Sequence, residues 1–144
     1  MIQKMEQLLR EKDICVLATA SENRPHCSLM AYVTDDLCRK IYMVTVREST
    51  KYRNLTRNPR VSLLMDTREE HSGPKRAGAQ ALTVSGRFQE IEDHTELDAV
   101  RLRLLNRHPH LRELVERQDA VIFAVKIASF LLLQGITNAH FHEV

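Results

Sequence analysis

The stretch YMVTVRESTKYRNLTRNPR, residues 42–60, contains a strand, a polar turn and a short helix in direct succession. Its β-branched first residues predict the strand. Ser49 or Thr50 is suited to cap the helix that follows, and Pro59 ends it. Because the first amides of a helix lack intrahelical partners, a strand that delivers hydroxyl groups and Lys51 to that turn forms an arrangement that binds anions.

The positive charges around this turn have two interpretations. On a helix that starts at residue 50, Lys51 and Arg53 point about 200° apart, so we predict Lys51 as the anion contact and Arg47 as the second choice. Alternatively, Ser49 is only a helix cap and the cations form a solvated face. Nucleic-acid binding is not predicted, because interleaved aromatic residues are missing and the chain has no Trp.

The residues before this stretch predict a helix and two strands. Apolar side chains at helical spacing favour an amphipathic helix over residues 2–12. The apolar run 14–20 and the segment 26–33 favour two strands, joined by the polar turn 21–25. Short connections between successive strands are typical of an antiparallel meander.

The residues that follow the stretch 42–60 predict four strands, one loop and one helix. We predict strands over residues 60–65, 80–91, 120–127 and 130–136, a mobile loop over 66–79, and a helix from Asp93 that Pro109 breaks. Gly86 is a candidate for a bend. About six antiparallel strands and three or four helices favour a barrel decorated by helices over an alternating βαβ sheet.

Composition sets the class of protein. The 144 residues fit one domain, 1–144, and a net charge of +2 does not by itself imply a nucleic-acid partner. No apolar run approaches the roughly 20 residues of a membrane span, so no membrane association and a cytoplasmic location are expected. The three cysteines match no zinc spacing and are predicted to be buried or half-buried thiols, and no metal site is predicted.

Five fragments together resemble the FMN-binding core of the pyridoxamine 5'-phosphate oxidase-like family. They are VLATA (16–20), NRPH (23–26), IYMVT (41–45), STKYRNL (49–55) and NPRVSLL (58–64). The resemblance covers residues 14–65 well and the rest in outline. It implies a mostly β fold with α-helices, namely a six-stranded antiparallel split β-barrel of Greek-key topology with peripheral helices. It also implies a homodimer with FMN between the subunits.

The resemblance assigns candidate cofactor contacts, residue by residue. Ser49, Thr50 and Lys51 would face the FMN phosphate, with Arg47 beside them, although the family often has arginine where this chain has Thr50. The residues implied beside the flavin ring, and on the strand that begins at residue 80, are Ser28, Leu29, Met30, Val44, Thr45 and Gln80.

The resemblance implies a flavoprotein oxidoreductase, with electrons passing from a nicotinamide-type donor to an unknown small acceptor. No catalytic residue is predicted, because the cofactor supplies the redox chemistry. The basic substrate residues of true pyridoxamine 5'-phosphate oxidases are not recognisable, so that substrate is not expected. The alternative is a non-catalytic flavin- or haem-binding protein. The pairs His108/His110 and His140/His142 are its candidate ligands, and a deazaflavin remains open as the cofactor.

Overall fold

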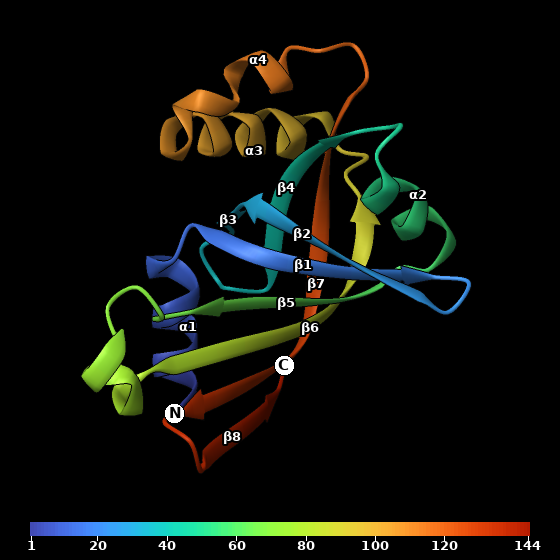
Figure 1. Cartoon of the computed structure of the whole chain (residues 1–144). Helices are drawn as coiled ribbons and strands as arrows, with labels where there is room; N and C mark the ends of the chain where they lie inside the picture. Colours follow the sequence, from blue (N-terminus) through green and yellow to red (C-terminus); the bar gives the residue numbers. More distant parts are fainter.

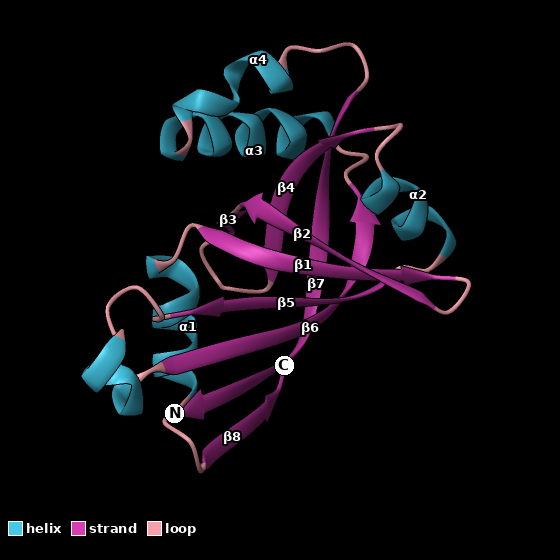
Figure 2. Cartoon of the chain, viewed as in Figure 1, coloured by secondary structure: helices cyan, strands magenta, loops and turns pink.

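The structure, a computed structural model, describes residues 1–144, and its strands form one curled antiparallel sheet (Figures 1 and 2). The strands are β1 (Ile14–Ser21), β2 (Arg24–Ala31), β3 (Val33–Thr34), β4 (Lys40–Val46), β5 (Arg60–Asp66), β6 (Gln80–Glu90), β7 (Ala120–Gln134) and β8 (Asn138–Glu143). The helices are α1 (Ile2–Glu11), α2 (Thr50–Arg57), α3 (His94–Arg107) and α4 (Arg112–Val115), with the 3₁₀ turns η1 (Gly73–Gly78) and η2 (Pro109–Leu111).

The strand order is β2-β1-β5-β6-β7-β4-β3, and β8 pairs with β7. Its two ends, β2 and β3, are consecutive in the chain and are joined at Tyr32. The sheet therefore curls back on itself, which confirms the predicted α+β split barrel. Because β2 pairs only with β1 and β4 pairs with β3 and β7, the barrel stays open between β2 and β4.

The number of strands differs from the prediction: the sheet has eight strands, not six. The predicted strands 120–127 and 130–136 are one continuous strand, β7, whose register shifts opposite Ser85 and Gly86. Ala128 is the extra residue of this bulge, so a local irregularity gave the appearance of two strands. A Cβ on Gly86 would lie 2.5 Å from the carbonyl oxygen of Lys126, so a side chain at this position would collide with the backbone of β7 beside the bulge.

Two further segments differ in secondary structure from the prediction made from the sequence. The predicted strand 26–33 is divided between β2 and β3, because the chain bends at Tyr32 to pair first with β1 and then with β4. Residues 138–143, for which no strand was predicted, form β8 and extend the edge of β7. None of the helices has the length and apolar composition that a membrane span requires.

Two hydrophobic cores hold the molecule together. The larger one fills the inside of the curl, where Met5, Leu8 and Leu9 of α1 pack against inward side chains of the sheet. The smaller one lies between β4 and residues 94–115, which we call the α3–α4 arm, and Val44 packs near Leu104 there. Figure 1 shows α3 and α4 at one end of the sheet, and α1 toward the other end. The arm consequently covers the outward face of β4, close to the open side of the barrel.

Candidate functional site

A pocket of about 330 Å³ lies at the opening between β2 and β4, and we call it the β2–β4 pocket. It is lined by Leu29, Met30, Ala31, Val44, Thr45, Val46, Ser49, Lys51, Leu111 and Leu114. Two strands, the start of α2 and the η2–α4 segment thus contribute to one cavity. Its walls are mostly apolar, with its polar side chains at the α2 end.

The start of α2 supplies hydrogen-bond donors to this pocket. Ser49 is the N-cap: its Oγ accepts a hydrogen bond from the Tyr52 amide at 3.2 Å and lies 3.0 Å from Thr45 Oγ1. The amides of Thr50 and Lys51 form no hydrogen bond within the chain. If Thr45 donates to Ser49, the Ser49 hydroxyl is free to donate as well. The junction therefore offers two amides and one hydroxyl to an acceptor.

Lys51 adds a positive charge that no carboxylate of the chain neutralises. Its side chain is half-buried and forms no ion pair. Arg53, on the same helix, lies 3.9 Å from Glu48 instead. A lysine at the edge of a pocket, beside free helix amides, is suited to bind a phosphate or carboxylate.

The open edge of β2 provides a second set of polar groups. The Tyr32 amide donates to the Asp13 carbonyl at 3.0 Å, which identifies this pair as hydrogen-bonded. Hydrogen-bonded and non-hydrogen-bonded pairs alternate along an antiparallel ladder. Leu29 and Ala31 therefore direct their N–H and C=O groups away from β1, toward the pocket that both residues line.

The structure brings together six of the ten predicted cofactor residues: Leu29, Met30, Val44, Thr45, Ser49 and Lys51. Ser28 is adjacent on β2 but pairs with Leu17. Thr50 is exposed at the first turn of α2, where it contributes its free amide. These eight residues surround a single place in the fold.

Arg47 and Gln80 lie elsewhere within one chain. Arg47 donates its amide to the Asp119 carbonyl and lines a neighbouring cavity together with Tyr52 and Arg101. Gln80 begins β6, where its amide donates to Thr67 Oγ1 at 2.8 Å. Neither residue lines the β2–β4 pocket of its own chain.

Sequence reasoning missed Leu111 and Leu114. They follow Pro109 at a spacing that indicated only a short helical turn, and nothing local placed them against β4. The packing of the α3–α4 arm on the second core brings them to the pocket.

An apolar stripe crosses the outer face of the sheet and ends at the same pocket. Cross-strand pairing puts the following side chains in one row: Leu29, Val16, Leu64, Thr83, Leu131 and Phe141. The two end residues are 74% and 64% exposed. The next row contains the small side chains of Ala18, Ser62, Ser85 and Ser129 and ends at Glu143 of β8. The first three of these residues line a hollow of about 580 Å³. An apolar stripe with exposed ends is typical of an interface.

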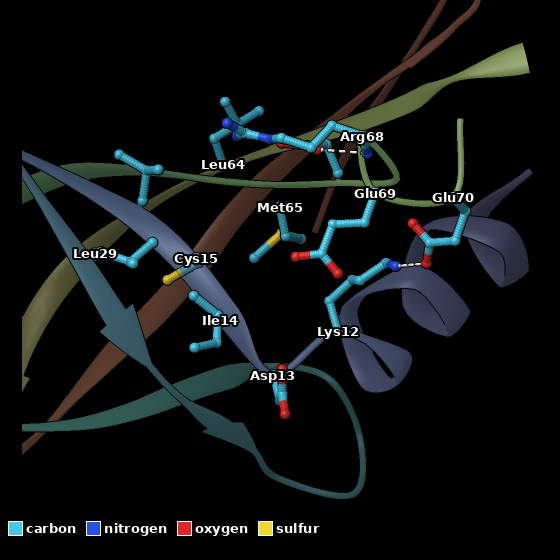
Figure 3. A pocket seen from close by; sticks show the side chains of 12 residues that line it. Lys12, Asp13, Ile14, Cys15, Leu29, Leu64, Met65, Arg68, Glu69 and Glu70 are labelled. Carbon is cyan, nitrogen blue, oxygen red and sulfur yellow. Dashed lines mark hydrogen bonds and ion pairs between the residues drawn. The ribbon is translucent and has the colours of Figure 1, made fainter. Parts of the chain in front are cut away.

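A further hollow of about 330 Å³ adjoins the stripe and is shown in Figure 3. Its apolar side is formed by Ile14 and by stripe residues, including Leu29. Its other side is charged, and the ion pair of Lys12 with Glu70 ties the loop after β5 to the end of α1. Burial raises the pKa of the Cys15 thiol in its wall to about 12, so this thiol stays protonated at neutral pH.

The loop 66–79, predicted to be mobile, is anchored by this ion pair and contains η1. The hydrogen bond from Lys12 lowers the pKa of the Glu70 carboxyl, so the contact is present at neutral pH and is lost as the pH falls through that lowered pKa. Replacing Glu70 with Gln removes the charge. We expect faster amide hydrogen exchange in residues 67–79 at pH 7, measured by mass spectrometry.

Glu69→Gln is the matched control for this prediction, because Glu69 is exposed, adjacent in sequence and not ion-paired. Its exchange in the loop should equal that of the wild-type protein. Equal exchange in both variants and the wild type would mean that the ion pair does not restrain the loop.

The histidine pairs do not form a metal centre. His108 is 2% exposed and its Nε2 lies 2.9 Å from the Tyr32 carbonyl oxygen, which gives it a structural role, while His110 is exposed. His140 and His142 lie on one face of β8, opposite Leu132 and Phe130. No group of three or more histidine, cysteine or carboxylate side chains could hold a metal ion. Cys15 and Cys38 are buried as expected, but Cys27 is exposed.

Comparison with known proteins gives one family and several similar folds. The family model of pyridoxamine 5'-phosphate oxidase matches residues 1–133. No curated protein matches the sequence. Among solved structures, the haem-binding protein from Mycobacterium smegmatis superposes with a TM-score of 0.83 at 17% identity, over 97% of this chain and 56% of that one. This chain therefore spans little more than half of that protein.

Two other solved structures match over nearly their whole length. An FAD-binding protein from Mesorhizobium loti has a TM-score of 0.74 at 20% identity, covering 92% of this chain and 93% of its own. The haem storage protein HutZ from Vibrio cholerae has a TM-score of 0.71 at 21% identity, covering 96% of this chain and 92% of its own. At these identities the likeness concerns the fold.

Proposed function

Since the chain belongs to the pyridoxamine 5'-phosphate oxidase family, we propose that it binds FMN in the β2–β4 pocket and acts as a flavin-dependent oxidoreductase. The observation that carries this proposal is the convergence of the free Thr50 and Lys51 amides, the Ser49 hydroxyl and the Lys51 ammonium group at one end of an apolar cavity. A phosphate ester attached to a flat, largely apolar ring system matches that distribution of groups.

The phosphate would lie at the first turn of α2. The two amides and the Ser49 hydroxyl would donate hydrogen bonds to the phosphate. Lys51 would neutralise part of the phosphate charge, and it has no ion pair within the chain that would first have to break. The exposed Thr50 side chain stands where relatives often have an arginine, so this chain would hold the phosphate with one cation fewer.

The ring would lie along β2 and β4. Leu29, Val44 and Leu114 provide apolar contact, and the backbone groups of Leu29 and Ala31 can pair with the polar edge of the ring. Bound FMN would carry electrons between a donor and an acceptor. The role of the chain is to bind and orient the cofactor and to exclude water, so no side chain of the pocket needs to act as an acid or base. A nicotinamide-type donor and a small acceptor remain the proposed partners.

We further propose that two chains share each flavin as a homodimer. A pocket of about 330 Å³ is at the small end of the roughly 300–1,000 Å³ typical of ligand sites, so a second wall is required to bury a flavin. The outer apolar stripe begins at Leu29, which also lines the pocket. A partner packed on the stripe would supply that wall, and Gln80, remote from the pocket of its own chain, is a candidate contact from the partner.

The hydrogen bond between Thr45 and Ser49 gives a specific test of the phosphate contacts. Thr45→Val keeps the shape of the side chain but removes the group 3.0 Å from Ser49 Oγ. Ser49 would then be less well oriented to donate to the phosphate. We expect FMN affinity to fall by about 1 kcal/mol, roughly fivefold in Kd, measured by quenching of flavin fluorescence.

Thr56→Val is the matched control for Thr45→Val, because the Thr56 hydroxyl binds only the Arg53 carbonyl on the exposed side of α2. It should leave the Kd for FMN within twofold of the wild type. An unchanged Kd in Thr45→Val would show that the orientation of Ser49 does not matter for the cofactor.

The absorption spectrum of the purified protein tests the function as a whole. We expect flavin bands that bleach with NADH or NADPH under anaerobic conditions and return when an electron acceptor is added. A protein that binds no flavin, even after incubation with excess FMN, would refute the proposal. Stable flavin binding without reduction by either nicotinamide would support a non-catalytic carrier instead.

Haem binding is the second candidate, because the relatives in Mycobacterium smegmatis and Vibrio cholerae are described as haem-binding and haem storage proteins. In this chain His140 is half-exposed and His142 exposed on β8, so either imidazole is a candidate axial ligand. A haem absorption band after haem addition, lost in the double variant His140→Ala/His142→Ala, would favour this function. Absence of that band would remove it.

A further inference from the structure

Three arginine side chains converge in a depression that is separate from the β2–β4 pocket, and we call it the arginine pocket. It has a volume of about 400 Å³ and is lined by Arg10, Val33, Thr34, Arg103, Asn106 and Arg107. These residues come from α1, β3 and α3, which are far apart in sequence. Only one of the six, Val33, is apolar. The two pockets share no lining residue.

Backbone carbonyl groups hold the three guanidinium groups in place. Arg107 Nη2 donates to the carbonyls of Arg10, Glu11 and Lys12 at 2.9, 3.2 and 3.1 Å, at the end of α1. Arg103 Nη1 donates to the Thr34 carbonyl, and Arg10 Nη2 lies 3.3 Å from a carbonyl oxygen of the β3–β4 turn. Since these contacts already order the arginine side chains, ligand binding would cost less conformational entropy than it would with freely moving side chains.

These contacts leave most of the positive charge uncompensated. The only carboxylate bound to any of the three arginines is Asp36, which lies 2.5 Å from Arg103 Nη2 and is 86% exposed. The carboxylates of α1 form no ion pair with these arginines: Glu6 lies 4.0 Å from Arg39, and Glu11 accepts a hydrogen bond from Gln7. The three guanidinium groups therefore have one carboxylate partner between them.

Several donors of the pocket are still free. A guanidinium group has five N–H donors in a planar fork. Arg107 and Arg10 each use only Nη2 within the chain, so the Nε and Nη1 groups of both have no acceptor. The Asn106 side chain is exposed at the rim and also forms no hydrogen bond. Guanidinium forks match the oxygen atoms of a phosphoryl group in pairs.

We propose that the arginine pocket is a binding site for a compact, multiply charged phosphoryl anion, either inorganic pyrophosphate or a phosphate ester of similar size. Arg10 and Arg107 hold the anion from two sides, with Asn106 donating from the rim and Arg103 adding positive potential. The site is independent of the flavin proposal, because the two pockets share no lining residue.

Isothermal titration of the whole protein with pyrophosphate, at constant ionic strength and with FMN in excess, tests this site. We expect saturable binding with one anion per chain. Arg10→Gln removes a charge from an exposed helix position and should raise the Kd at least about tenfold, the loss of one charge-assisted hydrogen bond. Asn106→Asp places a carboxylate at the rim and should have a similar effect. Arg76→Gln, an exposed arginine of η1 with no ion pair, should leave the Kd within twofold.

Four results would overturn the proposal. The first is no saturable binding to the wild-type protein. The second is an equal Kd in Arg10→Gln, Asn106→Asp and wild type, and the third is an equal loss in Arg76→Gln, which would indicate general screening of surface charge. Lys51→Ala separates the two sites, because this variant should bind pyrophosphate like the wild type. The fourth contrary result is loss of pyrophosphate binding in Lys51→Ala, which would place the anion at α2. If the protein bound no FMN but gave the expected results with pyrophosphate, the flavin proposal would be wrong and the proposal of an anion site in the arginine pocket would stand.

Discussion

Replacing Lys51 with Ala is expected to weaken FMN binding by about 1.5–3 kcal/mol, which is a 10- to 150-fold rise in Kd. The physical reason is that Lys51 is the only cation lining the β2–β4 pocket and forms no ion pair that could compensate. Without it, the doubly charged phosphate would rest on two amides and one hydroxyl. Fluorescence titration of the FMN-free protein with FMN measures the effect directly.

Lys4→Ala is the matched control, because Lys4 is an exposed lysine of α1 that forms no ion pair and is remote from the pocket. It should bind FMN like the wild type. Thr50→Arg adds a second cation next to Lys51, and we expect it to lower the Kd. If Lys51→Ala binds FMN as tightly as Lys4→Ala does, Lys51 is not a phosphate contact, and the anion lies elsewhere.

The predictable part of this site is the part made by neighbouring residues. The order of strand, cap and helix over residues 42–60 places Thr45, Ser49 and Lys51 together through short-range rules, and the structure confirms that order. The position of Arg47 could not be predicted in the same way. Its amide donates to Asp119, a residue that reaches this point only through the pairing of β4 with β7.

Long-range pairing also explains the differences in the fold. Ala128 and Ser129 interrupt an apolar pattern, which in sequence resembles the end of a strand. In the sheet, β6 continues opposite both halves of β7, and a bulge at Ala128, opposite Ser85 and Gly86, absorbs the extra residue. Similarly, the exposed segment 138–143 has no strong strand pattern of its own, and it is ordered by the free edge of β7.

Leu64→Asp is expected to dissociate the proposed homodimer. Leu64 is the centre of the outer apolar stripe, between Val16 of β1 and Thr83 of β6. In a separate chain the new carboxylate would face water, so the fold should survive, as circular dichroism can check. In a dimer packed on the stripe, the same carboxylate would be buried without a partner. The desolvation cost is several kcal/mol, so a dimer dissociation constant about a thousandfold higher is expected.

Sedimentation velocity distinguishes the two states, because a dimer has twice the 16.7 kDa mass of one chain. Leu102→Asp is the matched control: Leu102 is 64% exposed on α3 and lies outside the stripe, so this variant should remain dimeric. Since the partner is proposed to complete the β2–β4 pocket, Leu64→Asp should also lose FMN affinity, although Leu64 does not line that pocket. A monomeric wild-type protein with fully bound flavin would contradict the shared site, and the single-chain pocket would then have to hold the cofactor alone.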